Sequence, residues 1–383
     1  MTSKLIYLDN AATTFPKSKK VLDAMLQTYL QHGVSPGRGG YDLADQTGEI
    51  VQETRKKLAE FFEAPDPNRI IFSSNATDAL NTIIHGLVEP NDHIIATRLE
   101  HNSVLRPLYH VSKSQGIHYD LTPFDGDGFV DPVEIKKRIK PNTKMVIVSH
   151  VSNVLGSIQP VEEIGQICRD RNILFIIDAA QSAGHIPVSM KETNASAIVF
   201  TGHKSLYGPA GIGGIAIHPE LAIKTSRFGG TGIKSISKIH PQEFPYRLEA
   251  GTINTIGVFG LFYSLDFINK IGLSNISRNE ALLMKRLKDG LSSIKNVHLY
   301  GPENLNHQTA ILSITIKGKS PEDICAILDA DYHIATRAGL HCSPLTHEGM
   351  GTGNTGAVRF SLGLFNAAEE IDTVLEAVSQ IAR

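Results

Sequence analysis

The sequence predicts an α/β protein with a mostly parallel, doubly wound sheet in a large domain and a smaller α+β domain at the C-terminal end. From about residue 69, short apolar runs alternate with longer amphipathic stretches. Continuous β-branched runs are typical of strands buried on both faces, and their alternation with helices indicates βαβ units. The chain has 383 residues, of which 41% are apolar and 20% charged, so it can bury two such cores.

The alternating part of the chain supplies the elements of the large domain. Its predicted strands cover residues 69–72, 93–96, 144–148, 174–177, 197–200 and 213–217, and its predicted helices cover 78–87, 104–115 and 161–171. Because each helix follows a strand, the strands are expected to run parallel in one sheet.

The pattern changes after about residue 255. A long helical stretch over 258–271 continues past residue 274, and then come a strand at 311–316 and helices at 321–329 and 367–381. We therefore expect residues 16–257 to form the large domain. Residues 1–15 and 258–383 are expected to form the small one.

Composition and charge exclude several kinds of partner. Lysine and arginine total 37 and aspartate and glutamate 39, so the net charge of −2 gives no reason to expect nucleic acid or an anionic membrane. Asp9 breaks the first apolar run, and no apolar stretch approaches the ~20 residues that span a bilayer. The three cysteines form neither a disulfide framework nor a zinc pattern. We expect a cytoplasmic protein with reduced thiols and no metal site.

Small polar residues follow the predicted strands, where ligands bind in open parallel sheets. Residues 73–78 open a helix, so they can hold a phosphate, although Asn75 or Thr77 could simply cap that helix. His101 follows the second strand, where an isolated histidine is usually structural. Asp178 ends another strand, either as a helix cap or as the partner of a buried cation.

Lys204 stands at the next strand end, in Thr-Gly-His-Lys before a glycine-rich loop. A desolvated lysine can react with a carbonyl, but Lys204 could also bind phosphate or lie in solvent. The chain lacks a Walker loop and a dinucleotide-binding glycine motif after its first strand. A phosphate cradle, a strand-end acid, a ring-sized gap and an amine together match what pyridoxal phosphate (PLP) requires.

A series of motifs resembles the class V aminotransferase family of fold-type I PLP enzymes, and within it the cysteine desulfurases with a short catalytic loop. The resemblance covers essentially the whole chain. In family order the motifs are YLDNAATTFP (7–16), SSNATDALN (73–81), EHNS (100–103), SHVSNVLG (149–156), DAAQSAGH (178–185), TGHKSLYGPAGIG (201–213), EAGT (249–252) and RAGLHC (337–342). Leu340 and residues 346–352 depart from the pattern of many relatives.

The resemblance implies a role for each matching residue. Lys204 would bind the cofactor aldehyde covalently, Asp178 would pair with the pyridinium nitrogen, and His101 would stack on the ring. Further cofactor contacts are implied for Ala76, Thr77, Asn153, Gln181, Thr201, His203 and Thr252. Thr252 would reach the phosphate from a neighbouring subunit, which implies a homodimer with shared active sites. Asn153, Arg337 and Arg359 would bind the substrate.

Cys342 decides the implied reaction. Cys168 and Cys325 lie among apolar residues and are interpreted as core, whereas Cys342 lies in a turn with basic neighbours, where a thiol can be reactive or structural. By resemblance, Cys342 takes sulfur from L-cysteine, releases L-alanine, and passes its persulfide to an acceptor protein. Lys204 would remove the α-proton, and His101 is a candidate for later proton transfers.

Three alternatives to this reaction remain at the level of sequence. The chain could be a selenocysteine lyase, or another class V lyase or transaminase, for which Cys342 would be dispensable. It could also be a non-catalytic protein that has kept only the fold. His341, Cys342 and His347 could in principle bind a metal, but no second ligand cluster accompanies them.

Overall fold

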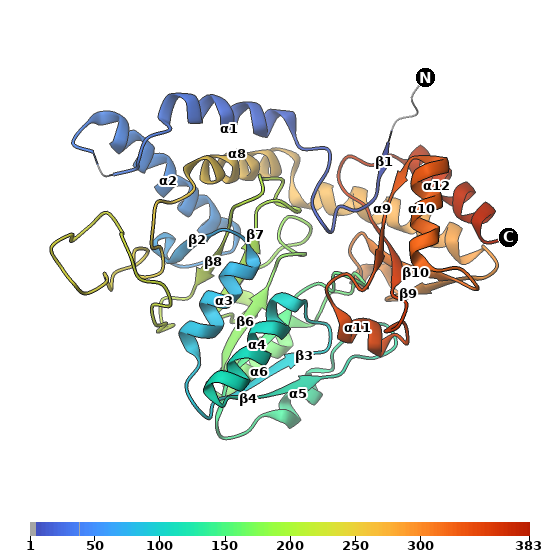
Figure 1. Cartoon of the computed structure of the whole chain (residues 1–383), viewed down its shortest axis with the longest axis horizontal. Helices are drawn as coiled ribbons and strands as arrows, with labels where there is room; N and C mark the ends of the chain where they lie inside the picture. Colours follow the sequence, from blue (N-terminus) through green and yellow to red (C-terminus); the bar gives the residue numbers. More distant parts are fainter. Residues whose placement is uncertain (1–4, 38) are drawn as a thin grey trace.

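The computed structural model describes residues 5–37 and 39–383 and confirms the predicted α/β class. A seven-stranded sheet and a four-stranded sheet lie in different halves of the molecule (Figure 1). A two-stranded sheet joins the beginning of the chain to its C-terminal part. The predicted division at residue 257 stays a prediction.

The large sheet is mostly parallel, with strand order β2-β8-β7-β6-β5-β3-β4. Only β8 runs antiparallel to its neighbours, and all other pairs are parallel. The strands are β2 (Ile70–Ser73), β3 (His93–Thr97), β4 (His118–Thr122), β5 (Thr143–Ser149), β6 (Leu174–Asp178), β7 (Ala197–Thr201) and β8 (Gly213–Ile217). The carboxyl ends of β2, β3, β5, β6 and β7 therefore share one edge of the sheet, as predicted.

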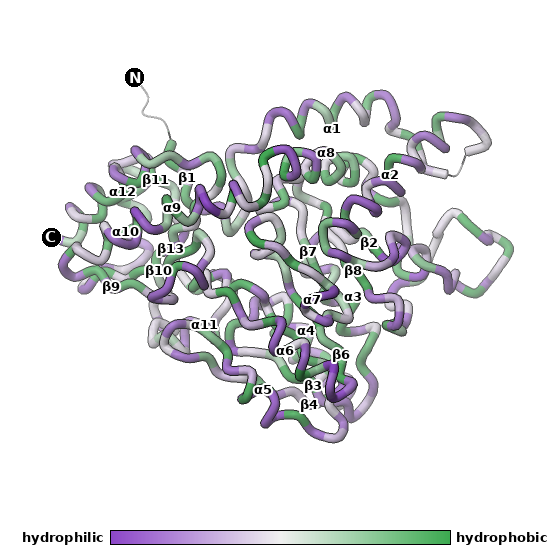
Figure 2. Tube along the Cα trace, turned by 180° about the vertical axis from the view of Figure 1, so that it is seen from behind, coloured by the Kyte–Doolittle hydropathy of each residue, from purple (hydrophilic) through white to green (hydrophobic). Residues whose placement is uncertain are grey.

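Helices cover both faces of this sheet, because alternate strand residues point to opposite sides. Phe175 and Ile177 belong to one apolar core, whereas Ile176 between them belongs to another. The first core includes residues of α2 (Asp42–Phe61), α5 (Pro132–Arg138), α6 (Val161–Asp170), α7 (Met190–Thr193) and α8 (Thr255–Ile271); the second includes α3 (Ala76–Leu87) and α4 (Asn102–Gln115). Helix α1 (Lys19–His32) lies against α8, with hydrophilic and hydrophobic residues alternating along it (Figure 2). A short 3-10 turn, η1 (Pro67–Arg69), precedes β2.

The C-terminal part has its own core around the antiparallel sheet β12-β13-β10-β9. Its strands are β9 (Val297–Tyr300), β10 (Ile311–Ile316), β12 (Arg337–Gly339) and β13 (Ala357–Ser361), with the pair β1 (Ile6–Tyr7) and β11 (Ile334–Ala335) beside them. Its helices are α9 (Leu273–Ser292), α10 (Pro321–Tyr332), α11 (Pro344–Gly349) and α12 (Ala368–Ile381), and η2 (Leu305–His307) is a 3-10 turn. Ile6 and Leu8 also join this core, so residues near the N-terminus pack with the C-terminal part.

The long helix expected across residue 274 is in fact two helices, α8 and α9, bent by 73°. Gly272 lies between them with φ +87°, a conformation that residues with a side chain rarely adopt. The bend lets α8, together with Ile276 of α9, pack in the first core of the large sheet, while later residues of α9 pack in the core of the C-terminal part. Among the described residues no single helix is long and apolar enough to cross a membrane, although these two together pass that test of length and composition.

Gly184 sets a close approach that shapes the loop after β7. Its φ is +94°, and a Cβ atom there would lie 2.0 Å from the carbonyl oxygen of Ser205, the residue after Lys204. A side chain at this position would therefore force the Lys204 loop away from the loop after β6.

We expect Gly184→Ala to lower the free energy of unfolding by about 2 kcal/mol or more, because it combines a steric clash with an unfavourable φ. Urea unfolding followed by circular dichroism measures the change. Gly126→Ala is the matched control, because its Cβ would meet nothing within 4 Å. Equal losses in the two variants would contradict this account of Gly184.

Candidate active site

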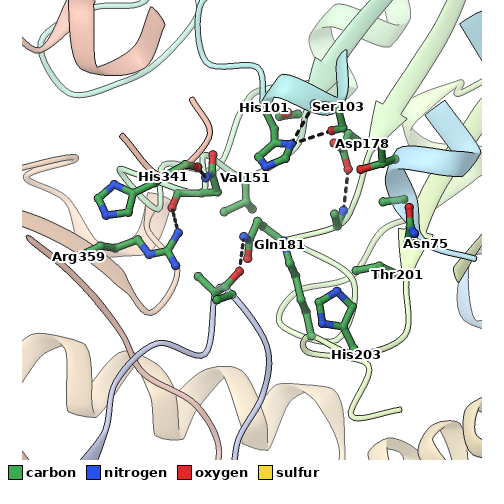
Figure 3. Close-up of a pocket in the computed structure, with 18 of the residues that line it drawn as sticks. Asn75, His101, Ser103, Val151, Asp178, Gln181, Thr201, His203, His341 and Arg359 are labelled. Atoms are coloured by element: carbon green, nitrogen blue, oxygen red, sulfur yellow. Dashed lines mark hydrogen bonds between the residues drawn. The ribbon is translucent and has the colours of Figure 1, made fainter. Parts of the chain in front are cut away.

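A cavity of about 220 Å³ opens at the carboxyl edge of the large sheet. Figure 3 shows side chains from several elements converging on it. Most residues predicted for the site line this cavity: Ala76, Thr77, His101, Asn153, Asp178, Gln181, Thr201, His203, Lys204, Arg337 and Arg359. Two predicted residues, Thr252 and Cys342, do not.

Lys204 reaches the cavity from the loop that follows β7. Burial lowers the pKa of its ammonium to about 8, although the nearby Asp178 carboxylate opposes this shift. Its backbone is held in place, because its carbonyl oxygen accepts hydrogen bonds from Thr14 Oγ1 at 2.8 Å and from the Tyr207 amide at 2.9 Å. A buried amine that is partly neutral near pH 8 is a nucleophile and a base.

Asp178 and Gln181 line the cavity at the end of β6. Burial raises the pKa of Asp178, whereas the Ala180 amide, which donates to Oδ1 at 2.9 Å, and Lys204 lower it. Gln181 Nε2 donates to the Ala11 carbonyl at 3.0 Å (Figure 3). Gln181 Oε1 is buried without a hydrogen-bond partner among the described residues. This side of the cavity can therefore still accept a polar group of a ligand.

The start of α3 faces the cavity with the N–H groups of a first helical turn. Asn75 caps the helix, because its side chain accepts from the Asp78 amide at 2.9 Å. Ala76 and Thr77 are the first two helical residues, and the first N–H groups of a helix have no partner within the helix. The capping and phosphate interpretations are thus compatible: Asn75 caps, while Ala76 and Thr77 stay available to an anion.

Thr201 and His203 line the same cavity as this helix start. The Thr201 hydroxyl is buried and has no hydrogen-bond partner among the residues that the structure describes. Burial, with the nearby Lys204 and Lys17, lowers the pKa of His203 to about 4. A buried hydroxyl that lacks a hydrogen-bond partner is costly unless a ligand satisfies it. The Thr201 hydroxyl is therefore available to a polar group of a ligand.

His101 begins α4 and is held in one tautomer. Its Nδ1 accepts from the Ser103 amide at 3.0 Å and lies 2.9 Å from Ser103 Oγ (Figure 3). Since a backbone amide can only donate, the proton of the neutral ring is on Nε2. Burial, followed by Lys204 and nearby arginines, lowers the pKa of His101 to about 4, so the ring is neutral at physiological pH.

Two acidic residues of the site escaped the sequence analysis. Glu100 is fully buried, accepts from Thr97 Oγ1 at 2.6 Å and Ser149 Oγ at 2.7 Å, and has its pKa raised to about 7 by burial. Asp9 forms an ion pair with Arg359 at 2.6 Å. Glu100 precedes His101 in the EHNS motif, and that position was the only signal for it.

The arginines predicted for the substrate stand on one side of the cavity. Arg359 is 1% exposed, and besides its ion pair with Asp9 it donates to the Asn153 carbonyl at 3.0 Å. Its Nε is buried without a hydrogen-bond partner among the described residues. Arg337 lies nearer to Cys342, with its Nη2 4.0 Å from Sγ. Both guanidinium groups can thus contribute positive charge beside the buried lysine.

Cys342 is exposed in a turn beside the cavity and lines a neighbouring groove that includes His101. His341 and Cys342 have φ angles of +50° and +58°. Each such residue costs about 1–3 kcal/mol and persists only where its surroundings hold it. Asn153 Nδ2 donates to the His341 carbonyl at 2.7 Å, and Asn153 Oδ1 accepts from Ser343 Oγ at 2.7 Å. Asn153 therefore forms hydrogen bonds to the turn that carries Cys342 and also lines the cavity.

The other two cysteines lie where the sequence analysis placed them, in apolar surroundings. Cys168 is buried in the large core, and burial raises its pKa to about 12. Cys325 is half-buried against the small core, and burial raises its pKa to about 11.

Thr252 is exposed and lines two other cavities. Among residues 5–37 and 39–383, no group of three or more histidines, cysteines or carboxylates could hold a metal ion.

Residues 6–374 match the model of the aminotransferase class-V family. The chain belongs to the class-V aminotransferase family. It is 33% identical to a probable cysteine desulfurase of Pyrococcus abyssi, with 100% of this chain and 96% of the relative covered. It is also 33% identical to a probable cysteine desulfurase of Methanothermobacter thermautotrophicus, with 98% and 94% covered.

Solved structures of this family have the same fold. The apo structure of a cysteine desulfurase from Thermococcus onnurineus NA1 is 36% identical and has a TM-score of 0.93, with 99% of this chain and 94% of that chain covered. The cysteine desulfurase CsdA of Escherichia coli, in an S-sulfonic acid form, is 26% identical and has a TM-score of 0.89, with 98% and 94% covered. The resemblance seen in the motifs is therefore confirmed.

The residues present fit PLP. The start of α3 and the unpartnered Thr201 hydroxyl offer donors to a phosphate, Asp178 offers a carboxylate to a ring nitrogen, and Lys204 offers an amine to an aldehyde. All of these groups line one cavity. Two of the polar atoms left unsatisfied there, Thr201 Oγ1 and Gln181 Oε1, belong to residues that such a ligand would engage.

We expect incubation with PLP followed by borohydride reduction to leave a covalent adduct on Lys204, detected by peptide mass spectrometry. The rate of attachment should rise as pH increases from about 7 to 9, since the amine loses its proton with a pKa of about 8 and only the neutral amine is a nucleophile. Lys204→Ala should give no adduct. An adduct on Lys17 instead would show that the wrong amine has been assigned.

Proposed function

We propose that this chain is a PLP-dependent cysteine desulfurase that converts L-cysteine to L-alanine and keeps the sulfur as a persulfide on Cys342. The observation that carries the proposal is the placement of an exposed thiol beside a cavity that already holds Lys204, Asp178 and two arginines. The similarity to proteins named cysteine desulfurases supports the same reaction.

PLP, when bound, withdraws electrons from the α-carbon of an amino acid. Ala76, Thr77, Thr201 and His203 would hold its phosphate, and Asp178 would hold the ring nitrogen in its protonated form. Gln181 and Asn153 would make further contacts to the cofactor, and His101 would cover the ring. These assignments follow the cavity lining and the donors and acceptors described above.

Substrate binding would fall to the positive side of the cavity. Arg359 donates to Asp9 and to the Asn153 carbonyl, and these bonds fix the orientation of its guanidinium in the cavity, where it would meet the carboxylate of a substrate. Lys204 would be the base for the α-proton, because it lines the cavity and its lowered pKa leaves part of the amine neutral at physiological pH. His101 carries its ring proton on Nε2, from which it can be donated.

Sulfur transfer moves a single sulfur atom. The Cys342 thiolate forms a bond to the substrate sulfur while the bond between that sulfur and the substrate carbon breaks. The electron pair of the broken bond stays on the carbon, which takes up a proton to become the methyl group of alanine. One thiol and one cysteine thus give one persulfide and one alanine, with no external oxidant or reductant. An acceptor protein would then remove the outer sulfur.

The active form is proposed to be a cytoplasmic homodimer. Thr252 is exposed and lies outside the cavity of its own chain, which fits a contribution to the cavity of a second copy. The segment before it exposes Phe228, Ile236 and Ile239, with 74%, 102% and 74% of each residue accessible. Apolar side chains gathered on one segment are typical of an interface.

We expect Cys342→Ala to lower persulfide and alanine formation from L-cysteine by about 100-fold or more, because the nucleophile is lost. Binding of PLP should be unchanged, since Cys342 does not line the cavity. Trapping of the persulfide with an alkylating reagent and assay of alanine measure the two products. Cys325→Ala is the matched control and should keep native activity.

Full desulfurase activity in Cys342→Ala would overturn the proposal. Alanine released by that variant from L-selenocysteine, but not from L-cysteine, would favour a selenocysteine lyase. Transfer of the amino group to a keto acid would favour a transaminase.

A further inference from the structure

A chain of three buried side chains lies behind the Cys342 turn. His341 Nδ1 is 3.1 Å from His347 Nε2, and His347 Nδ1 is 2.9 Å from Thr352 Oγ1. At the other end, His341 Nε2 is 3.0 Å from the Arg337 carbonyl oxygen. The three residues are 4%, 0% and 4% exposed, so they lie in the interior. The proposed reaction gives His347 and Thr352 no role.

The Arg337 carbonyl fixes the direction of every hydrogen bond in this chain. A carbonyl oxygen can only accept, so the proton of the neutral His341 ring is on Nε2 and its Nδ1 accepts. His347 must then donate from Nε2, which leaves its Nδ1 to accept from the Thr352 hydroxyl. Burial lowers the pKa of His341 to about 3 and of His347 to about 4, so both rings are neutral in this arrangement.

This series of buried hydrogen bonds links the two ends of the segment that carries the Cys342 thiol. Arg337 precedes Cys342 by five positions, and Thr352 follows it by ten. The Arg337 carbonyl is bonded to His341, His341 to His347, and His347 to Thr352. The turn between them is left-handed at His341 and Cys342. Its carbonyl groups are held from outside, because Asn153 Nδ2 donates to His341 and the Asn102 amide donates to Cys342 at 2.8 Å.

We propose that His347 and Thr352 are positioning residues that act through His341 to fix the Cys342 thiol beside the cavity. His341 lines the cavity next to Arg359 (Figure 3), whereas His347 and Thr352 do not line it. Without the buried hydrogen bonds the His341 ring loses its anchor, so only Asn153 and the Asn102 amide hold the turn and Sγ loses its fixed distance from the substrate sulfur. The inference rests on the proposed role of Cys342 as nucleophile.

Two buried threonines give a matched pair of variants. Thr346 Oγ1 donates to the Arg98 carbonyl at 3.2 Å and has no bond to the histidines, whereas Thr352 Oγ1 donates to His347. Both are at most 4% exposed, so Thr346→Val and Thr352→Val each remove one buried hydroxyl of equal size. His347→Leu removes the chain's central donor. His347→Gln keeps an N–H that can donate to His341.

The experiment measures three quantities on the full-length protein. Single-turnover persulfide formation on PLP-loaded enzyme reports placement of the thiol toward the substrate. Alkylation by iodoacetamide without substrate reports exposure and reactivity of Cys342, because burial raises the pKa of Cys168 and Cys325 to about 12 and 11. Thermal unfolding reports stability.

We expect Thr352→Val and His347→Leu to slow persulfide formation by about tenfold or more, because a small misplacement of a reacting atom is costly. Their alkylation rates should stay within about twofold of native, since a free reagent needs no placement. Thr346→Val should lose a similar amount of stability and keep native persulfide formation. His347→Gln should recover to within about threefold of native.

Equal rates of persulfide formation in Thr346→Val and Thr352→Val would overturn the inference, as would a parallel fall in alkylation. Cys342→Ala separates this failure from failure of the proposed function. If Cys342→Ala is inactive while Thr352→Val is native in rate, only the positioning role is wrong. If Cys342→Ala stays active, the proposed function fails, and the positioning role fails with it.

Discussion

The site depends on the burial of two opposite charges at one edge of the large sheet. Asp178 ends β6, and Lys204 follows β7, the neighbouring parallel strand. Burial opposes both charged forms, while each charge stabilises the other. Because β6 and β7 are neighbouring parallel strands, their carboxyl ends place the two groups in the same cavity. The result is a lysine whose pKa is lowered to about 8, and such a lysine can serve as nucleophile and base.

The beginning of the chain closes this arrangement from the other side. Thr14 binds the Lys204 carbonyl, Ala11 accepts from Gln181, and Asp9 pairs with Arg359. These three contacts link residues separated by 170 to 350 positions. Since β1 also pairs with β11, and Asp9 forms a bridge with Ser361 of β13, the N-terminal segment connects the lysine loop to the C-terminal part. The cavity walls from both sheets are therefore held in one relative position.

Features that depend only on the local sequence pattern, such as the ends of buried strands, could be predicted from the sequence. The strand ends that place Asp178 and Lys204 could be located from apolar runs, because a buried strand requires a continuous apolar sequence. The break at Gly272 was missed, since the apolar residues continue through it and only the packing of two separate cores reveals the bend. Glu100 was missed for a different reason: its acceptor role depends on Ser149, 49 positions away.

The two reactive groups of the site are controlled by opposite means. Lys204 is made reactive by burial, which lowers its pKa even though the nearby Asp178 carboxylate opposes that shift. Cys342 is exposed, and its contribution depends on where the sulfur stands relative to the substrate. For the first kind of group the strand end itself supplies the burial. The second kind depends on hydrogen bonds between loops, and so the structure was needed to find His347 and Thr352 behind the thiol.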